Sequence, residues 1–399
     1  MQHGWYRLIA PGLLMAATGV GAGDLMTGTL AGAELGTAAL WAVVVGALLK
    51  FVLSEGVARW QLATGTTLLE GWHDKLGKWI RWPFLVFLAM FTVIVGRALA
   101  NACGVAGTAI LPIGDTETSV TVWAMIHSLV GVAIVLTGGF RAFESIMSAL
   151  IGLMFLTVVG TTAMIAPPLG TIAAGLVPSV PQSGSSWLLA VLGGVGGTVT
   201  LLSYGYWIGE HGRRGMGMLR ECRIDLAVGN GVTAVFGLCV IIIGSQIEVS
   251  GSGARLATQM AERLGEAVGP VGHWVFLIGF WGAVFSSLLG VWQSIPYMFA
   301  DFARMGSGRS GDLRTSKPYR LCVVLVAIVP LFLLNAPVQQ IQLTYGIVGA
   351  CFLPALALTL ILLNGRPKWV GQDACNPLWI TVALIGCLAF FLALPLLGS

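Results

Sequence analysis

Residues 187–209 read WLLAVLGGVGGTVTLLSYGYWIG, and residues 8–33 read LIAPGLLMAATGVGAGDLMTGTLAGA. Each segment is long enough to cross a hydrocarbon core, which takes about 20 apolar residues per helix. Each also carries a run of glycines near its middle, at Gly193–Thr200 and at Thr18–Asp24. Because a glycine costs about 1 kcal/mol relative to alanine inside a helix, we expect the helix to break at both places.

The alternative role for such glycines is close packing of helices through small residues. Polar groups beside the runs favour a binding site instead. Asp24 closes the first run, and Thr198, Thr200 and Ser203 accompany the second. A carboxylate at bilayer depth is costly unless it faces a cavity or a partner, so Asp24 is the sharpest functional candidate.

The composition identifies an integral membrane protein. Of 399 residues, 56% are hydrophobic and 10% are charged, whereas an average soluble domain has about 25% charged residues. The apolar runs are too long for the alternating strands of a membrane β-barrel. A dispersed net charge of +4 gives no reason to expect nucleic-acid binding. The sequence shows no nucleophile together with a general base at a water-accessible position. We therefore expect that the protein is not an enzyme and that it has no cofactor.

Eleven windows of about 20 apolar residues predict an all-α protein with eleven transmembrane helices. They are 8–33, 39–62, 82–111, 119–139, 144–167, 187–209, 225–247, 271–300, 320–335, 340–364 and 377–397. Short connections predict one transport domain over 1–399, with no cleavable signal peptide. The two glycine-rich spans, the first and the sixth, occupy corresponding positions if 8–167 and 187–364 form two repeats, with 377–397 as an extra helix. Inverted repeats with broken helices are typical of secondary transporters.

The basic residues predict the orientation. With the amino terminus in the cytoplasm, 17 of the 21 Lys and Arg residues fall in inner loops, and only Arg255 and Arg263 fall outside. This asymmetry predicts a multi-pass protein of the cell (plasma or inner) membrane, with its carboxyl terminus outside. The outer loop 248–269 has helical periodicity at Leu256, Met260 and Leu264, which predicts a short amphipathic helix.

Charges inside the spans have competing interpretations. Glu55 and Arg59 are four residues apart, which favours an ion pair at the inner end of the helix. Lys50 and Glu55 are five apart, which is poor spacing. Arg97 either pairs with Asp24 or Glu55 or meets an anionic part of the substrate. His127 and His273 are expected to be hydrogen-bonded core residues.

Several segments resemble the Nramp divalent-metal transporters. Ala10-Pro11-Gly12 through Asp24 to Ala31–Gly36 is similar to the first helix of that family, which runs GPG, DPGN and a TDLQAG-like stretch. The resemblance continues at Ala58–Gly65, in the sixth span, and at Ser286-Ser287 with Gly290. It implies a LeuT-type fold of 5+5 transmembrane helices plus an eleventh, with helices 1 and 6 broken, and transport by alternating access.

The chain departs from the family at its metal site. The DPGN aspartate falls on Gly21 and the asparagine on Asp24, while the A-x-x-M-P-H pattern of helix six falls on Gly197, Thr200, Leu201 and Leu202. The acidic pattern of helix three becomes Ala98–Asn101 after Arg97, and the glutamine of helix ten falls beside Tyr345. The resemblance therefore implies a site without the thioether, the histidine or the proton-relay acids of the family.

These differences favour a wide, oxygen-lined site with one carboxylate, which suits Mg²⁺ or Mn²⁺ because a hard ion retains much of its hydration. We expect a monomeric secondary transporter or uniporter in the lipid bilayer, with weak or no proton coupling and the divalent ion as substrate. The site set is Gly21, Asp24, Gly197, Thr200, Thr18 and Ser203, with Asp24, Thr200 and Gly197 as metal ligands. We expect Arg97, Asn101, Glu55 and Tyr345 to form a gate or charge network. A carrier of a small organic solute such as an amino acid, or a receptor with a vestigial site, remain alternatives.

Overall fold

The computed structural model describes residues 4–138, 140–181, 184–247, 257–259, 261–262, 269–305, 312–334 and 336–397. Every regular element in these ranges is helical. The regular apolar runs leave no period-2 pattern for strands, and a helix satisfies all of its backbone groups within one segment, as a lipid environment requires.

Each of the eleven predicted windows contains helix, with ends within a few residues of the predicted ones. The long helices are α3 Leu40–Thr64, α5 Arg81–Ile110, α6 Thr116–Thr137, α7 Phe140–Ile165, α11 Leu219–Gly244, α13 Pro270–Arg304, α15 Val338–Asn364 and α17 Leu378–Leu397. The ninth window is α14 Lys317–Ile328, which continues as a 3₁₀ turn over Val329–Leu333. Short helices α4 Leu68–Gly71, α8 Leu169–Gly175 and α16 Pro367–Val370 lie between the spans.

The first and sixth windows are each divided. The first consists of α1 Gly4–Gly19, π-helical turns over Val20–Thr27, and α2 Gly28–Leu35. The sixth consists of α9 Ser185–Gly194 and α10 Thr200–Glu210 with a non-helical link between them. Within the described residues, seven helical stretches are long and apolar enough to cross a membrane, and Leu8–Gly19, Ser185–Gly194 and Leu378–Leu394 are shorter apolar helices.

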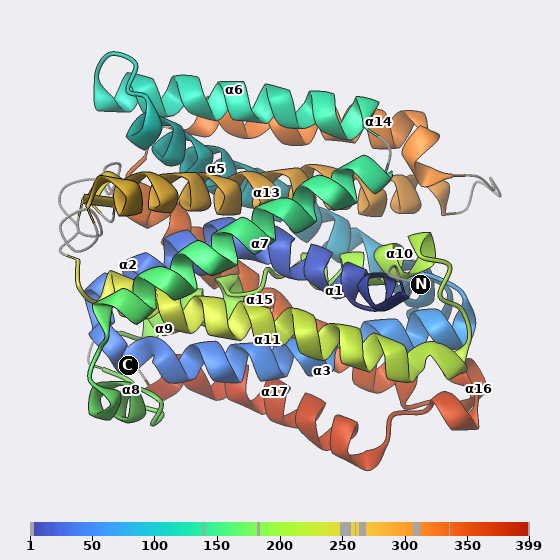
Figure 1. Cartoon of the computed structure of the whole chain (residues 1–399). Coiled ribbons are helices and arrows are strands. Elements are labelled where there is room, and N and C mark those ends of the chain that lie inside the picture. The colour runs from blue at the N-terminus through green and yellow to red at the C-terminus, as the bar shows by residue number, and fades with distance from the viewer. Residues whose placement is uncertain are drawn as a thin grey trace.

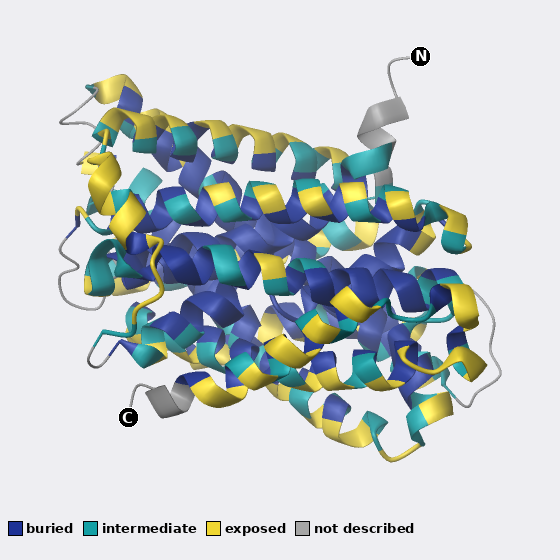
Figure 2. Cartoon of the chain, turned by 90° about the horizontal axis from the view of Figure 1, so that it is seen from below, coloured by how far each residue is buried: buried dark blue, intermediate teal, exposed yellow. Residues whose placement is uncertain are grey.

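The helices run roughly side by side, and the divided spans lie in the middle of the bundle (Figure 1). Helices α6 and α14 flank one side, and α17 flanks the other. The outward faces of the peripheral helices carry the exposed positions, whereas the central helices are buried on all sides (Figure 2). The exposed positions include large apolar residues such as Val86, Leu156 and Leu392, as expected for faces that meet lipid.

Two minor predictions have different outcomes. His127 is a hydrogen-bonded core residue, because its Nδ1 lies 2.7 Å from the Trp123 carbonyl and its Nε2 accepts from Trp281 Nε1 at 2.7 Å. Leu256, Met260 and Leu264, which define the predicted amphipathic helix, lie outside the described residues, although 257–259 and 261–262 are helical.

Candidate functional site

Two left-handed glycines break the sixth span. Gly196 and Gly197 have φ of +73° and +72°, a conformation that residues with a side chain rarely adopt. The Gly197 N–H turns back to the Gly194 carbonyl at 2.9 Å, and Thr198 Oγ1 donates to the Gly193 carbonyl at 2.5 Å. The expected break is therefore present, and it turns carbonyls and N–H groups of the backbone toward the neighbouring helices.

The interruption in the first span has a different cause. Ser287 of α13 inserts its hydroxyl between two backbone groups that would otherwise bond to each other in an α-helix. Its Oγ accepts from the Gly21 N–H at 2.5 Å and donates to the Ala17 carbonyl at 3.2 Å. A side chain inserted into the i→i−4 ladder is a recognised cause of helix distortion. Here the helix widens into π turns and does not unwind.

Glycines of the first span also serve close packing. A Cβ at Gly19 would lie 2.5 Å from the Gly196 carbonyl carbon, and a Cβ at Gly23 would overlap the Gly194 carbonyl oxygen. Gly19 and Gly23 are four residues apart, so both lie on one face of the helix. Both interpretations of the glycine runs therefore apply, since the first span packs its bare backbone directly against the break in the sixth.

Asp24 lies at this contact and is fully buried. Its Oδ2 accepts from the Gly196 N–H at 2.9 Å, whereas its Oδ1 has no hydrogen-bond partner. The Oδ1 atom faces bare backbone of α11, because a Cβ at Gly237 would lie 3.3 Å from it. Asp24 therefore has one oxygen held by the break and one oxygen free for a ligand.

Lys50 of α3 is a site residue that the sequence did not reveal. Its side chain is buried, and its Nζ donates to the Gly193 carbonyl at 2.9 Å and to the Val195 carbonyl. No carboxylate oxygen lies within 4.0 Å of Nζ among the described ion pairs, but the charge of Lys50 interacts with that of Asp24 across the link. The link thus offers an N–H to the acid and carbonyls to the ammonium.

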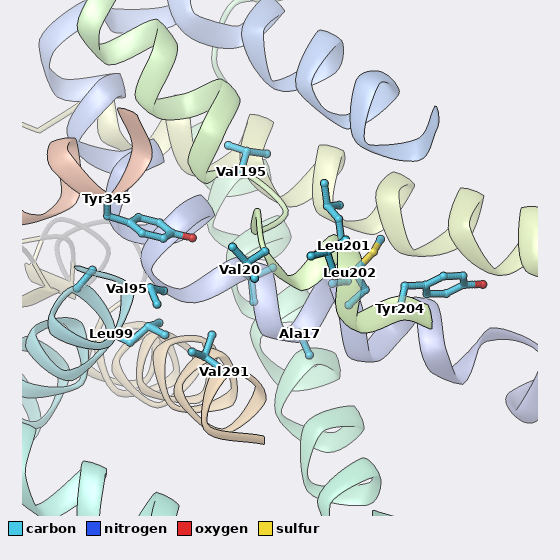
Figure 3. Packing of buried hydrophobic residues seen from close by; sticks show 14 of the residues in the cluster. Ala17, Val20, Val95, Leu99, Val195, Leu201, Leu202, Tyr204, Val291 and Tyr345 are labelled. Carbon is cyan, nitrogen blue, oxygen red and sulfur yellow. The ribbon is translucent and has the colours of Figure 1, made fainter. Parts of the chain in front are cut away.

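A small cavity lies on another side of the same break. Its volume is about 10 Å³, which is room for about one water molecule. Figure 3 shows Val95, Leu99, Val291 and Tyr345 gathered from three helices around this region. The cavity is lined by Thr18, Gly19, Phe91, Val95, Leu99, Gly197, Thr198, Val199, Thr200, Val291, Ile295 and Tyr345.

The predicted site residues divide between these two places. Thr18, Gly197, Thr200 and Tyr345 line the cavity, and the Thr200 hydroxyl is buried without a partner. Asp24 is not among the lining residues, and it faces the Lys50 side of the break.

Four further candidates lie elsewhere. Gly21 faces Ser287 of α13 rather than the break. Ser203 Oγ and Asn101 Oδ1 are both buried without a partner. Arg97 forms neither of the ion pairs considered for it, and no described carboxylate lies within 4.0 Å of its side chain.

Glu55 belongs to a charge cluster at one end of the bundle. It is fully buried and accepts from Arg59 at 2.5 Å and from Arg223 of α11 at 2.8 Å, which confirms the i, i+4 pair with Arg59. Arg59 also donates to the Ala374 carbonyl at 3.4 Å and the Cys375 carbonyl at 3.2 Å. The cluster therefore joins α3, α11 and the segment that precedes α17.

A second cluster at this end fixes the start of the first span. Asp225 Oδ1 accepts from the Gly12 N–H at 2.7 Å, and its Oδ2 accepts from Arg213 at 2.8 Å and from Tyr204 at 2.8 Å. Arg213 also donates to the Leu8 carbonyl at 2.6 Å. Burial would lower the pKa of Arg213, but the Asp225 carboxylate raises it above its ordinary value.

The donors at the break are oxygens. They comprise the Asp24 carboxylate, the Thr200 hydroxyl and the carbonyls of the unwound link, a set that suits hard cations. The described residues contain no group of three His, Cys, Asp or Glu side chains placed to hold a metal. A cation at the break would therefore depend on one carboxylate and on backbone oxygens.

Comparisons with known proteins place this geometry in a family. The sequence profile of the natural resistance-associated macrophage protein-like family, Nramp, matches residues 12–398. A divalent metal cation transporter, MntH, of Mycobacterium tuberculosis is 24% identical over 398 residues, which cover 94% of this chain and 86% of that protein. An uncharacterized protein of Pasteurella multocida is 29% identical over 191 residues, and there the match covers 48% of this chain and only 43% of the relative.

Solved structures share the fold. A mutant of the manganese transporter of Eremococcus coleocola superposes with a TM-score of 0.76 at 18% identity, covering 100% of this chain and 88% of the other. MhsT in complex with L-phenylalanine gives a TM-score of 0.60 at 14% identity, covering 98% of both chains. These likenesses confirm the predicted LeuT-type fold.

Proposed function

Because this chain belongs to the Nramp family, we propose that it carries divalent metal ions across a membrane by alternating access at the break in its sixth span. Membership in this family agrees with the predictions that the chain is no enzyme and that it takes metal only as a substrate. Relatives and structural neighbours are named as divalent-metal and manganese transporters. The observation that carries the proposal is the buried Asp24, with its free Oδ1, beside the unwound carbonyls.

Mg²⁺ and Mn²⁺ are the proposed substrates. The donor set of the break is purely oxygen, and nothing at the break supplies the soft ligand that would favour later transition metals. Asp24, Thr200 and Gly197 are the proposed ligands; Thr200 and Gly197 line the cavity and Asp24 does not, so an ion that used all three would need the break to rearrange. Mg²⁺ dehydrates reluctantly, so a site with one carboxylate and few protein ligands suits an ion that keeps part of its water shell.

Weak or absent proton coupling is the second part of the proposal. Tyr345 is the sole titratable side chain among the residues that line the cavity. Leu202 stands where the resemblance implies a histidine, and Asn101 stands where it implies an acid. Apart from Asp24 and Lys50 on its other side, the break therefore lacks a chain of described groups able to accept and pass on a proton as the ion crosses.

We further propose a single transport domain over 1–399, monomeric, in the cell membrane with its amino terminus in the cytoplasm. The charge clusters of Glu55 and Asp225 then lie on the cytoplasmic side, because both involve arginines of the predicted inner loops. The clusters then hold the inner end of the bundle together, and the complete burial of Asp24 makes this an occluded state of the site.

The test is flux in proteoliposomes with purified protein. We expect uptake of Mn²⁺ and Mg²⁺ without acidification of the lumen, and loss of uptake in Asp24→Asn. The exposed Asp373→Asn is the matched control, since it removes the same charge from the surface. Equal metal uptake by Asp24→Asn and the control would refute the site, and uptake of amino acids without uptake of metal would establish the organic-solute alternative.

A further inference from the structure

Lys50 occupies the place in which a cation would bind. Its side chain is 1% exposed, and its ammonium donates to two carbonyls of the break, those of Gly193 and Val195. Carbonyls freed by an unwound helix are the groups that coordinate cations in transporters with this architecture. The ammonium thus satisfies oxygens that a bound ion would otherwise use.

The charge balance of the site leads to the same conclusion. The Lys50 Nζ bonds to carbonyls of the link and the Asp24 carboxylate to an N–H of the same link, and an ammonium and a carboxylate together carry no net charge. A divalent ion that bound to Asp24 while the ammonium stayed would place three positive charges against one negative charge in a buried site. Like charges repel strongly where water does not screen them, so the ion and the ammonium exclude each other.

We propose that Lys50 is a tethered cation that holds the site when no metal is bound and withdraws when a divalent ion enters. The proposal rests on the proposed metal transport and assigns a competitor to that same site. It makes Lys50 a determinant of affinity, which keeps binding weak enough for release and neutralises Asp24 while the empty carrier returns.

The contacts of the Lys50 side chain with the link are few and involve backbone. A Cβ at Gly196 would lie 3.5 Å from Lys50 Cδ, so the bare glycine provides space for the lysine stem. Both hydrogen bonds of the ammonium end on backbone oxygens of the link. Withdrawal of the ammonium therefore releases the Val195 carbonyl and leaves the Gly193 carbonyl with only its bond from Thr198 Oγ1, without breaking a hydrogen bond between side chains.

The decisive variant is Lys50→Met, which keeps a long apolar stem and removes the charge. We expect Mn²⁺ to bind at least about tenfold more tightly to this variant than to the wild type in calorimetry on purified protein. Metal-induced thermal stabilisation should rise with the affinity, because a ligand that binds only the folded state raises its stability. Turnover in proteoliposomes should fall as release becomes slow.

Two further variants keep the result interpretable. Ser54→Ala is the matched control, since Ser54 is also buried on α3 but its hydroxyl contacts Met15 Sδ at 3.6 Å; we expect wild-type affinity. Asp24→Asn combined with Lys50→Met removes both charges, so it leaves no lone buried ion and should fold even if Lys50→Met alone is unstable. It should bind no divalent ion.

The outcomes separate the two proposals. If the wild type transports Mn²⁺ and Lys50→Met binds the ion no more tightly, Lys50 has a purely structural role and the tethered-cation proposal is wrong. The metal-transport proposal itself fails if neither the wild type nor Ser54→Ala nor Lys50→Met binds or transports a divalent ion. Tighter binding in Lys50→Met together with slower turnover supports both.

Discussion

The first and sixth spans are interrupted at facing positions, yet the two interruptions are built differently. In the sixth span the chain itself causes the break, because Gly196 and Gly197 adopt left-handed angles. In the first span the cause comes from another helix, because Ser287 inserts its hydroxyl between Ala17 and Gly21.

The difference shows that glycine runs in membrane helices have two separate uses. In the sixth span they permit a backbone conformation, and in the first they remove side chains so that two backbones meet. An unwound link presents donors and acceptors in several directions, whereas π turns keep most of their backbone hydrogen bonds within the helix. The sixth span therefore supplies the ligand groups, and the first supplies Asp24 and a close-fitting wall.

The largest loss of stability is expected where the packing leaves no space for an added methyl group. Gly23→Ala places a methyl group onto the Gly194 carbonyl oxygen, and overpacking of this kind costs about 3 kcal/mol. We expect a large fall in melting temperature by fluorescence-detected size-exclusion chromatography. The control is Gly160→Ala in α7, which meets nothing within 4 Å and should keep or raise stability. Equal melting temperatures for the two variants would contradict the packing role.

A smaller loss of stability is expected where a substitution mainly strains a left-handed backbone angle. At Gly196 a Cβ would meet Thr233 Cγ2 at 3.2 Å, so the left-handed φ dominates the cost, which is about 1–2 kcal/mol for a residue with a side chain. Asn tolerates this region better than a β-branched residue. We therefore expect Gly196→Asn to be more stable and more active than Gly196→Val. The reverse order in thermal stability and flux would contradict the conformational role of Gly196.

The inserted hydroxyl should contribute less still. Ser287→Ala removes one donor and one acceptor, but the Gly21 N–H and the Ala17 carbonyl are then free to bond to each other as in an α-helix. The net change in stability should stay within about 1 kcal/mol. Amide hydrogen exchange should show greater protection at Gly21 if the helix closes, and reduced protection would show that Ser287 is needed to satisfy the backbone.

The smallest effect on stability is expected at Thr200. Its hydroxyl is buried without a partner, so Thr200→Val should leave the melting temperature unchanged or slightly higher, because an unsatisfied polar group is replaced by an apolar one of the same shape. If the hydroxyl is a metal ligand, affinity for Mn²⁺ should fall about tenfold in calorimetry. Unchanged affinity would exclude Thr200 from the ligand set.

Much of the fold could be predicted because membrane helices are encoded locally. Apolar length and loop charge identified the eleven helical windows, and the glycine runs identified the two interruptions. The form of each interruption was not predictable in the same way. Ser287 lies 266 residues from Gly21 in the sequence, and no local pattern indicates that its hydroxyl reaches into the first span.

The site was predictable in part for the same reason. Asp24 and Thr200 are unusual within their own spans, so sequence alone draws attention to them. Lys50 also stands inside an apolar span, but its spacing to Glu55 is poor for a pair and the sequence offers no other partner nearby. Its real partners lie 143 and 145 residues away. A lone lysine amid an apolar helix is a signal for a distant acceptor, although the sequence does not say which one.

The Asp225 cluster sets an energetic threshold for opening the bundle at the end where α1 and α11 begin. Any motion that swings the start of α1 away from α11 must break the bonds from Gly12 to Asp225 and from Arg213 to the Leu8 carbonyl. Hydrogen bonds to charged groups contribute about 1.5–3 kcal/mol each, so loss of both bonds disfavours such an opening by about 3–6 kcal/mol, or at least about a hundredfold in its equilibrium. The turnover number of the carrier would then depend on how often thermal motion reaches this rare conformer, rather than on how fast the ion itself moves.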